Sequence, residues 1–215
     1  MGLRLQPKPG IETEIKLAVR DRKPVEKQLA VLGFMVLKPR HFERNYLFDF
    51  PDLRLSKSGR LLRLRVTASG NLLTFKGPPL RSSRYARRRE VETWVGNGAL
   101  LREILKSLEL REVFAYEKYR TVFVAPAPAP MRASPQAAFD QTPIGNYLEL
   151  EGPTGWIDSL ASRLGYSPRE YITATYLSLY RQNCRAQGRK PGNMVFNPAG
   201  RPASNRNWVS LPTGL

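Results

Sequence analysis

The sequence predicts an α+β protein: a closed eight-stranded antiparallel β tunnel with a polar, charged interior and helices packed outside. Three observations lead to this fold class. About eight segments have the composition of strands, and short turns join most of them. Six segments repeat charged residues at a spacing of two, with apolar residues between them. Amphipathic helices are also expected, and each needs an apolar surface on which to pack.

The first half of the chain alternates between strands and turns, with one helix. Asp21 is a suitable cap for this helix, Pro24 suits its first turn, and Gly33 ends it. Ser69-Gly70-Asn71 forms a tight turn between two strands. In order, we expect a strand at 11–20, a helix at 24–33, extended chain at 34–50, a strand at 60–66, its hairpin partner at 72–76, a basic loop at 80–86 and a strand at 87–95.

The second half adds three helices and three strands. Leucines and an isoleucine at helical spacing predict an apolar stripe made of Leu100, Leu101, Ile104, Leu105 and Leu108. In order, we expect a helix at 99–109, a strand at 113–124, a stiff Pro-Ala loop at 125–130, a strand at 132–139, a strand at 144–151, and helices at 155–164 and 168–181.

The composition divides the chain into three parts: an N-terminal extension at 1–10, a folded domain at 11–181 and a tail at 182–215. The tail is rich in Gly, Pro, Asn and Arg, has no hydrophobic periodicity and carries no acidic residue. Such a segment buries too little apolar surface to offset its loss of conformational entropy, so we expect it to be disordered.

Six of the expected strands carry polar side chains, mostly charged, on one face. Residues two apart on a strand share a face. These faces consist of Glu12, Glu14 and Lys16; Arg63 and Arg65; Thr74 and Lys76; Arg88, Glu90 and Glu92; Lys118 and Arg120; and Glu149 and Glu151. A sheet with one face in water explains the pattern, and so does a tunnel with its polar face inward. The helices favour the tunnel, because their stripes then pack on its apolar outer face.

The net charge of +17, from 35 Lys and Arg against 18 Asp and Glu, indicates an anionic partner. Nucleic acid, a phosphorylated small molecule and an anionic membrane surface all satisfy it. Cys184 is the only cysteine, which excludes an intrachain disulfide and fits a reducing compartment. No apolar run reaches the length of about 18 residues that a membrane span needs, and no signal peptide is visible. A cytoplasmic protein without a membrane partner is therefore expected.

Inside a tunnel, the carboxylates on these faces would lie close together. Two carboxylates about 4 Å apart repel by about 1 kcal/mol in water and by about 4 kcal/mol at an effective dielectric constant of about 20. Lys and Arg can compensate part of this charge, and a hard divalent ion such as Mg²⁺ or Mn²⁺ can compensate the rest. A lining that mixes acids and bases is therefore suited to a metal-complexed polyanion whose phosphates the bases hold.

These residues resemble the CYTH domain, a branch of the triphosphate tunnel metalloenzymes. The hallmark of the family, Glu-x-Glu-x-Lys on the first strand, is matched by Glu12, Glu14 and Lys16. The resemblance covers residues 10–181. Its further matches are Tyr46-Leu47-Phe48-Asp49, Leu62-Arg63-Leu64-Arg65, Leu73-Thr74-Phe75-Lys76-Gly77-Pro78, Arg88-x-Glu90-x-Glu92, Lys118-Tyr119-Arg120, and Asp140 followed by Ile144, Gly145, Tyr147, Glu149, Glu151 and Gly152. The joint order of these short matches makes the resemblance specific.

The resemblance implies a tunnel that binds a triphosphate end-on, with Mg²⁺ or Mn²⁺ as cofactor. It implies that the metal ligands are Glu12, Glu14, Asp140, Glu149 and Glu151, with Glu12 and Glu14 also positioning water. It implies that the phosphate chain is held by Lys16, Arg63, Arg65, Lys76, Arg88, Lys118 and Arg120. Glu12, Glu14 and Lys16 form the implied catalytic group. Glu90 and Glu92 match a less fixed acidic pair.

The expected function is metal-dependent hydrolysis of a triphosphate-containing small molecule. Inorganic tripolyphosphate is favoured, because no motif for recognising a base or a ring stands out. Class IV adenylate cyclases, which make cyclic AMP from ATP, and thiamine triphosphatases use the same site and stay as alternatives. A non-catalytic module that binds polyphosphate or RNA is the alternative from another class. Nucleic acid bound by the basic tail is a less favoured partner, and the sequence indicates no oligomeric state.

Overall fold

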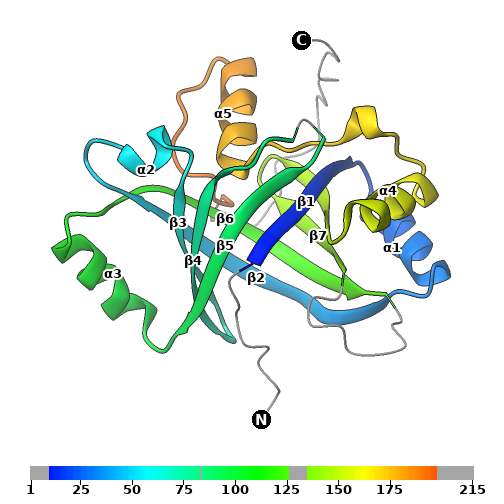
Figure 1. Cartoon of the computed structure of the whole chain (residues 1–215), viewed down its shortest axis with the longest axis horizontal. Helices are drawn as coiled ribbons and strands as arrows, with labels where there is room; N and C mark the ends of the chain where they lie inside the picture. Colours follow the sequence, from blue (N-terminus) through cyan, green and yellow to red (C-terminus); the bar gives the residue numbers. More distant parts are fainter. Residues whose placement is uncertain (1–9, 83, 126–134, 198–215) are drawn as a thin grey trace.

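Eight antiparallel strands close into a barrel in the computed structural model, which describes residues 10–82, 84–125 and 135–197. The strands are β1 (Gly10–Val19), β2 (Met35–Asp49), β3 (Leu61–Thr67), β4 (Gly70–Pro79), β5 (Ala86–Val95), β6 (Arg111–Val124), β7 (Gln136–Thr142) and β8 (Gly145–Glu151). Their order around the barrel is β1-β5-β4-β3-β2-β6-β7-β8 (Figure 1). The predicted closed eight-stranded tunnel is therefore confirmed.

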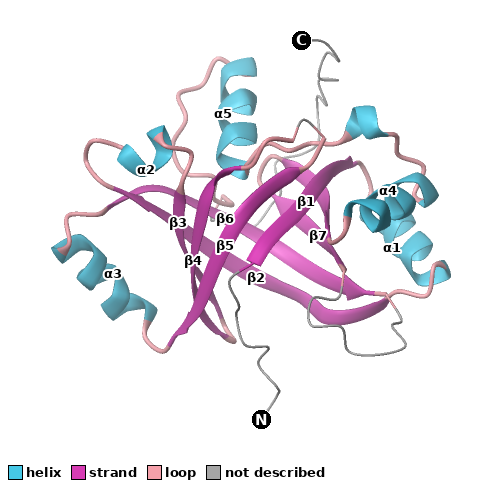
Figure 2. Ribbon diagram, viewed as in Figure 1, coloured by secondary structure: helices cyan, strands magenta, loops and turns pink. Residues whose placement is uncertain are grey.

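The helices lie on the outside of the barrel, as Figure 2 shows. They are α1 (Arg22–Val31), α2 (Arg54–Lys57), α3 (Gly98–Ser107), α4 (Thr154–Arg163), a 3₁₀ helix (Pro168–Glu170) and α5 (Tyr176–Ala186). Figure 1 shows α5 on a different side of the barrel from α1 and α4, and α3 apart from both. No helix in the described residues is long and apolar enough to cross a membrane.

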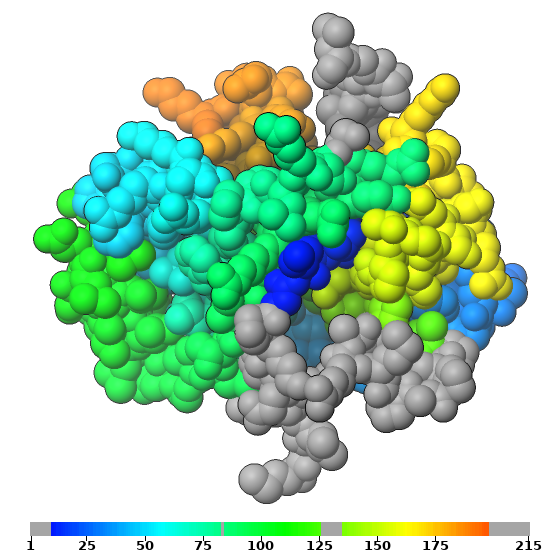
Figure 3. Space-filling view, viewed as in Figure 1, coloured from blue at the N-terminus to red at the C-terminus, as the bar shows by residue number. Residues whose placement is uncertain are grey.

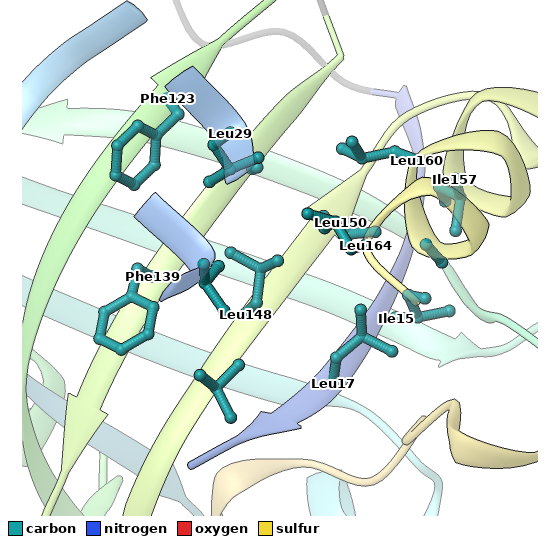
Figure 4. Packing of buried hydrophobic residues seen from close by; sticks show 14 residues of the cluster. Ile15, Leu17, Leu29, Phe123, Phe139, Leu148, Leu150, Ile157, Leu160 and Leu164 are labelled. Carbon is teal, nitrogen blue, oxygen red and sulfur yellow. The ribbon is translucent and has the colours of Figure 1, made fainter. Parts of the chain in front are cut away.

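Strand alternation sends the apolar side chains outward and the charged ones inward. On β1, Ile15 and Leu17 are fully buried against the helices, while the charged Lys16 between them lies inside the barrel. Figure 4 shows Ile15 and Leu17 together with Leu148 and Leu150 of β8, close to residues of α4. The apolar outer face is thus the surface that α1 and α4 need in order to bury their own stripes.

A second outer cluster lies under α3. Phe48 and Leu64 pack there against Leu105 of the helix. The stripe predicted for this helix is only half right, because Leu100, Ile104 and Leu108 are 62%, 55% and 60% exposed. The barrel is convex, so a straight helix meets it along a narrow line of side chains rather than across a wide face.

Residues 182–197 are folded, which corrects the expectation that the disordered tail begins at residue 182. Residues 182–186 are the last turns of α5, and Cys184 is 1% exposed. Met194, also 1% exposed, pairs with β6 through two backbone hydrogen bonds: its N–H donates to the Ala115 carbonyl, and its carbonyl accepts from the Glu117 N–H. Residues 198–215 lie outside the described residues, as do 1–9 and most of the Pro-Ala loop.

The helix predicted at 168–181 is two separate elements. Residues 168–170 form the 3₁₀ helix, and α5 begins only at Tyr176 after the cap residue Thr175, whose hydroxyl accepts from the Ser178 N–H at 3.2 Å. Between them the chain is extended, because Ile172 exchanges two backbone hydrogen bonds with Lys16 of β1. Pairing with a strand edge overrides the local helical pattern at this point.

We predict that Met194→Ala lowers the free energy of unfolding by about 2 to 5 kcal/mol, because it leaves a cavity among buried aromatic side chains. The neighbouring Val195, 38% exposed, provides the control: Val195→Ala should change stability by less than about 0.5 kcal/mol. Urea unfolding followed by circular dichroism measures both. Equal and negligible effects would mean that this segment is not part of the folded unit.

Candidate active site

The inner wall of the barrel gathers the charged residues predicted from the sequence. These residues come from every strand except β2. Most lie two apart on β1, β3, β4, β5, β6 and β8, and β7 contributes the single residue Asp140. The bases are Lys16, Arg63, Arg65, Lys76, Arg88, Lys118 and Arg120, and the acids are Glu12, Glu14, Glu90, Glu92, Asp140, Glu149 and Glu151. The polar interior therefore comes from residues far apart in the chain that only the closed sheet brings together.

Asp140 is the centre of the deepest part of the site. It is fully buried, and it accepts hydrogen bonds from Lys118 Nζ at 2.9 Å, from Arg120 Nε and Nη2 at 2.6 Å each, and from the Tyr176 hydroxyl at 2.6 Å. Both carboxylate oxygens are thus occupied by protein donors. In this arrangement Asp140 orients the two cations, which differs from the metal-ligand role that the resemblance implies.

Glu149 is the second acid of this deep group. It pairs with Arg120, and Lys16 Nζ lies 3.5 Å from its Oε1. Burial alone would raise the pKa of Glu149, but Arg120, Lys118 and Lys16 together hold it well below the ordinary value. This carboxylate therefore stays charged and bound to cations at all physiological pH values.

Glu43 on β2 is a site residue that the sequence analysis missed. It is 1% exposed, with Arg65 Nε at 3.6 Å, Lys118 Nζ at 3.7 Å and His41 Nε2 at 3.1 Å. Burial opposes ionisation, yet Arg65 and Lys118 keep the pKa of Glu43 well below its ordinary value. The signal was present in the sequence, since His41, Glu43 and Asn45 repeat at a spacing of two, but Glu43 is the only acidic or basic residue of the three apart from the histidine, so the pattern was weak.

The middle of the tunnel is lined by β3, β4 and β5. Arg63 Nη2 lies 3.3 Å from the Thr74 hydroxyl and 3.8 Å from Glu92, and that hydroxyl donates to Glu92 Oε1 at 2.7 Å. The buried Nε atoms of Arg63 and Arg65 have no hydrogen-bond partner. A buried N–H that lacks a partner is costly, so these two guanidinium groups are suited to accept an anionic ligand.

The part of the wall formed by β1 and its neighbours β5 and β8 carries more acidic than basic residues. Glu12 pairs with Lys76, which also lies 2.9 Å from Glu90, while Glu14 pairs with Lys16 at 2.8 Å. Burial and the neighbouring Glu90 raise the pKa of Glu12, although Lys76 opposes this. Glu12 shares Lys76 with Glu90, and Glu14 shares Lys16 with Glu149, so neither glutamate has a cation of its own.

Glu151 is the most perturbed member of this acidic group. It lies opposite Glu14 in the pairing of β1 with β8, and its only hydrogen-bond donor among the described residues is Gln136 Nε2 at 2.9 Å. Burial raises the pKa of Glu151 to about 7, with further contributions from Glu12 and Glu14. A bound cation would stabilise the charged form of such a carboxylate, and the protein itself supplies none next to Glu151 among the described residues.

A divalent ion fits the acidic group by donor type and by charge. Carboxylate oxygens are the ligands that Mg²⁺ and Mn²⁺ prefer, and Glu12, Glu14 and Glu151 would hold it. As the side chains lie, no three acidic, His or Cys residues of the described part of the chain converge into a ready metal site. Lys16 pairs with Glu14 and Lys76 with Glu12, so metal binding at these two carboxylates requires the lysines to turn away, toward an anionic ligand.

Arg88 lies apart from the other predicted phosphate-binding residues. Its Nη1 donates to the Gly59 carbonyl at 2.9 Å, and its backbone pairs with Pro79 at the end of β4. It therefore belongs to the rim of the barrel. Figure 3 shows this face of the molecule, with β1 flanked by β5 on one side and by the segment that includes β8 on the other.

The inner wall is nearly neutral overall, because its acids and bases are almost equal in number. The net charge of +17 is therefore carried by residues outside the tunnel. The surplus of Lys and Arg in the sequence predicts an anionic partner, but this surplus does not lie in the tunnel. What makes the tunnel suited to phosphates is the local arrangement of its cations.

Comparison with known proteins places this architecture in a family. The model of the CYTH domain matches residues 10–162. A predicted adenylate cyclase of Methanocaldococcus jannaschii is 29% identical over 142 residues, which cover 66% of this chain and 76% of that protein.

Two solved structures share the fold. One, a predicted adenylate cyclase from Vibrio parahaemolyticus, has a TM-score of 0.65 at 17% identity and covers 80% of this chain and 98% of its own. The other is a predicted adenylyl cyclase from Hippeastrum with a dominant triphosphatase activity. It has a TM-score of 0.56 at 17% identity, and the match covers 80% of this chain and 96% of the Hippeastrum chain. At these identities they establish the fold alone.

We predict that Glu151→Gln stabilises the metal-free protein at pH 8 by about 1 to 3 kcal/mol. In the folded state the raised pKa disfavours the charged carboxylate, so stability falls as the pH rises from the ordinary value of 4.5 to about 7. The gain should therefore be full above pH 7 and vanish below pH 4.5. Urea unfolding of both proteins between pH 4 and 8, without divalent ions, measures it.

The exposed Glu112, which pairs with Arg102 on the outside, provides the control. Glu112→Gln should show no such pH-dependent gain. A Glu151→Gln variant that is less stable than the parent protein at pH 8 would show that cations already compensate this carboxylate.

Proposed function

The chain belongs to the CYTH domain family, and we propose that it is a Mg²⁺- or Mn²⁺-dependent hydrolase of a triphosphate, with inorganic tripolyphosphate as the favoured substrate. One observation carries this proposal. A single tunnel holds buried Arg Nε–H groups that lack a hydrogen-bond acceptor and, elsewhere on its wall, carboxylates whose pKa values are raised. A phosphate chain satisfies the first group, and a divalent ion satisfies the second.

The basic residues of the tunnel bind and orient the phosphate chain. Arg63 and Arg65 have Nε–H groups without a hydrogen-bond acceptor, and their forked guanidinium groups match phosphate oxygens in geometry. Asp140 holds Lys118 and Arg120 in fixed positions, so these cations need no reorganisation when the substrate binds. Positioning and charge stabilisation supply most of the catalysis in phosphoryl transfer.

The acidic residues act on the attacking water. A divalent ion held by these carboxylates would neutralise negative charge on the phosphate oxygens. Glu12 and Glu14 orient a water for in-line attack on the terminal phosphorus. A carboxylate of this group accepts the proton of the water as the new P–O bond forms and the anhydride bond breaks. In the metal-free protein burial raises the pKa of Glu151 to about 7, so binding of a divalent ion at neutral pH would displace the proton that this carboxyl group partly carries.

Hydrolysis is favoured over cyclisation by the nature of the lining. The part of the described wall that is expected to hold the phosphate chain is charged, and at its end Tyr176 packs on the aromatic rings of Tyr116 and Tyr147. They do not form a free stacking surface for an adenine ring. The triphosphatase activity of the Hippeastrum protein belongs to the same fold.

Adenylate cyclase activity is the second candidate. It is favoured by the Methanocaldococcus jannaschii relative, which is a predicted adenylate cyclase at 29% identity. In that reaction the ribose 3′-hydroxyl of ATP attacks the α-phosphate and pyrophosphate leaves.

The experiment that tests the proposal is a substrate panel. Purified full-length protein is incubated with tripolyphosphate, thiamine triphosphate or ATP in Mg²⁺ or Mn²⁺, and phosphate, pyrophosphate and cyclic AMP are quantified. We expect phosphate from tripolyphosphate and loss of the activity on removal of the metal with EDTA. Cyclic AMP without phosphate release would replace the hydrolase with the cyclase, and no turnover of any substrate would favour a binding module.

We predict that Glu14→Gln lowers kcat for tripolyphosphate by at least about 100-fold, since the neutral amide orients water poorly and weakens the metal site. Thermal unfolding should change little. Glu112→Gln, on the outer face, is the matched control and should retain full activity. Turnover by Glu14→Gln equal to that of the parent protein would return β1 to a purely structural role.

A further inference from the structure

One end of the tunnel is filled by apolar side chains. Inward-facing residues of four strands meet the buried face of α5 there, and Met194 completes the cluster. The strand residues are Leu47, Leu61, Phe114, Tyr116 and Tyr147, and those of the helix are Tyr176, Leu179, Tyr180 and Cys184. On β6 these residues continue the inward face of Lys118 and Arg120, and on β8 they continue that of Glu149 and Glu151. The charged channel therefore ends at a wall of aromatic rings.

The chain after α4 is fastened to the barrel on both sides of α5. Before the helix, Ile172 pairs with Lys16 of β1, at a point beyond the last partner that β5 provides. After it, Met194 pairs with Tyr116 of β6, beyond the last partner that β7 provides. Both strand edges are thus used, and α5 is held across the end of the tunnel by backbone hydrogen bonds.

Tyr176, the first residue of α5, is the part of this wall that meets the charged channel. Its hydroxyl donates to Asp140 at 2.6 Å, and its ring centroid lies 5.4 Å from Lys16 Nζ and 5.2 Å from Lys118 Nζ. Burial and Asp140 raise the pKa of Tyr176, so the hydroxyl stays a donor. Three residues expected to hold phosphate or metal therefore contact one aromatic side chain of a segment beyond the family match.

We propose that Tyr176 closes the phosphate channel and thereby sets the longest phosphate chain that the tunnel accepts, which makes it a specificity-determining residue. This inference rests on the proposed binding of a triphosphate in the tunnel. A terminal phosphate that reaches Lys16 and Lys118 meets the ring, and a further phosphate would have to enter the aromatic cluster. Transfer of an anion into apolar surroundings without partners is strongly unfavourable, so longer linear chains bind less well.

The two parts of Tyr176 have separate roles. The ring blocks the channel, while the hydroxyl helps to fix Asp140 and, through it, Lys118 and Arg120. Tyr176→Phe keeps the block and loses the hydrogen bond. Tyr176→Ala removes both and leaves space next to the two lysines.

The test measures binding of linear phosphate chains to the full-length protein by titration calorimetry, without turnover. Tripolyphosphate, tetrapolyphosphate and a long-chain polyphosphate are titrated in the absence of divalent ions. We expect the parent protein to bind tripolyphosphate at least about tenfold more tightly than tetrapolyphosphate, a difference of about 1.4 kcal/mol. Tyr176→Ala should reduce that ratio to about threefold or less. Tyr176→Phe should keep the ratio while weakening all chains.

Tyr166→Ala is the matched control, because Tyr166 packs on the outer cluster and donates to the Ala18 carbonyl outside the tunnel. It removes the same side chain and should leave the ratio unchanged. Equal binding of the two chains by the parent protein would overturn the proposal, even if Tyr176→Ala does not fold. A ratio unchanged in folded Tyr176→Ala would overturn it as well.

The binding series also separates this inference from the proposed hydrolysis. If the parent protein discriminates by chain length but shows no turnover in the substrate panel, the result supports the role of Tyr176 and contradicts the proposed hydrolase. If the protein instead binds tripolyphosphate and tetrapolyphosphate equally and turns them over with equal kcat/KM, the result supports the proposed hydrolase and contradicts the role of Tyr176.

Discussion

The structure depends on the need to balance charge locally inside a closed sheet. Once eight strands form a barrel, every charged residue on the inner face is removed from most of the solvent, and each carboxylate requires a nearby cation. Asp140 meets this requirement with Lys118, Arg120 and the hydroxyl of Tyr176. Glu151 does not meet it, and its raised pKa is the consequence. The same requirement explains both parts of the tunnel: Asp140 is fully paired with cations, whereas the acidic group around Glu151 has too few of them. The proposed function is based on this contrast.

The closed end of the tunnel depends on a segment that sequence patterns describe poorly. Residues 182–197 have the composition of a disordered tail, yet Cys184 and Met194 are among the most buried residues of the protein. Met194 fills the edge of β6 that is free where β7 stops, just as Ile172 before α5 fills the edge of β1 where β5 stops, and a chain that fills a free edge satisfies backbone groups on both partners. A composition count does not register an edge that exists only after the sheet has closed.

The electrostatic surplus of the chain and the charges of its tunnel are separate properties. Lys and Arg exceed Asp and Glu by nearly two to one in the sequence, whereas the inner wall is almost balanced. In the proposed function the tunnel therefore binds phosphates through the placement of its cations, such as Arg63 and Arg65, whose Nε atoms lack a hydrogen bond, rather than through its net charge. Long-range attraction of anions is a property of the outer surface.

The sequence by itself determined the strands, their two faces and the family, because the period of two along β1 or β8 is a local property of neighbouring residues. It placed Glu12, Glu14 and Lys16 on one face correctly. It did not reveal Glu43, the only carboxylate among the alternating residues His41, Glu43 and Asn45 of β2, or the contact of Tyr176 with Asp140. Nor did it show that Asp140 and Glu149 are bound to cations while Glu151 is not. These features depend on which strands become neighbours and on what covers the end of the barrel, and only the tertiary structure decides both.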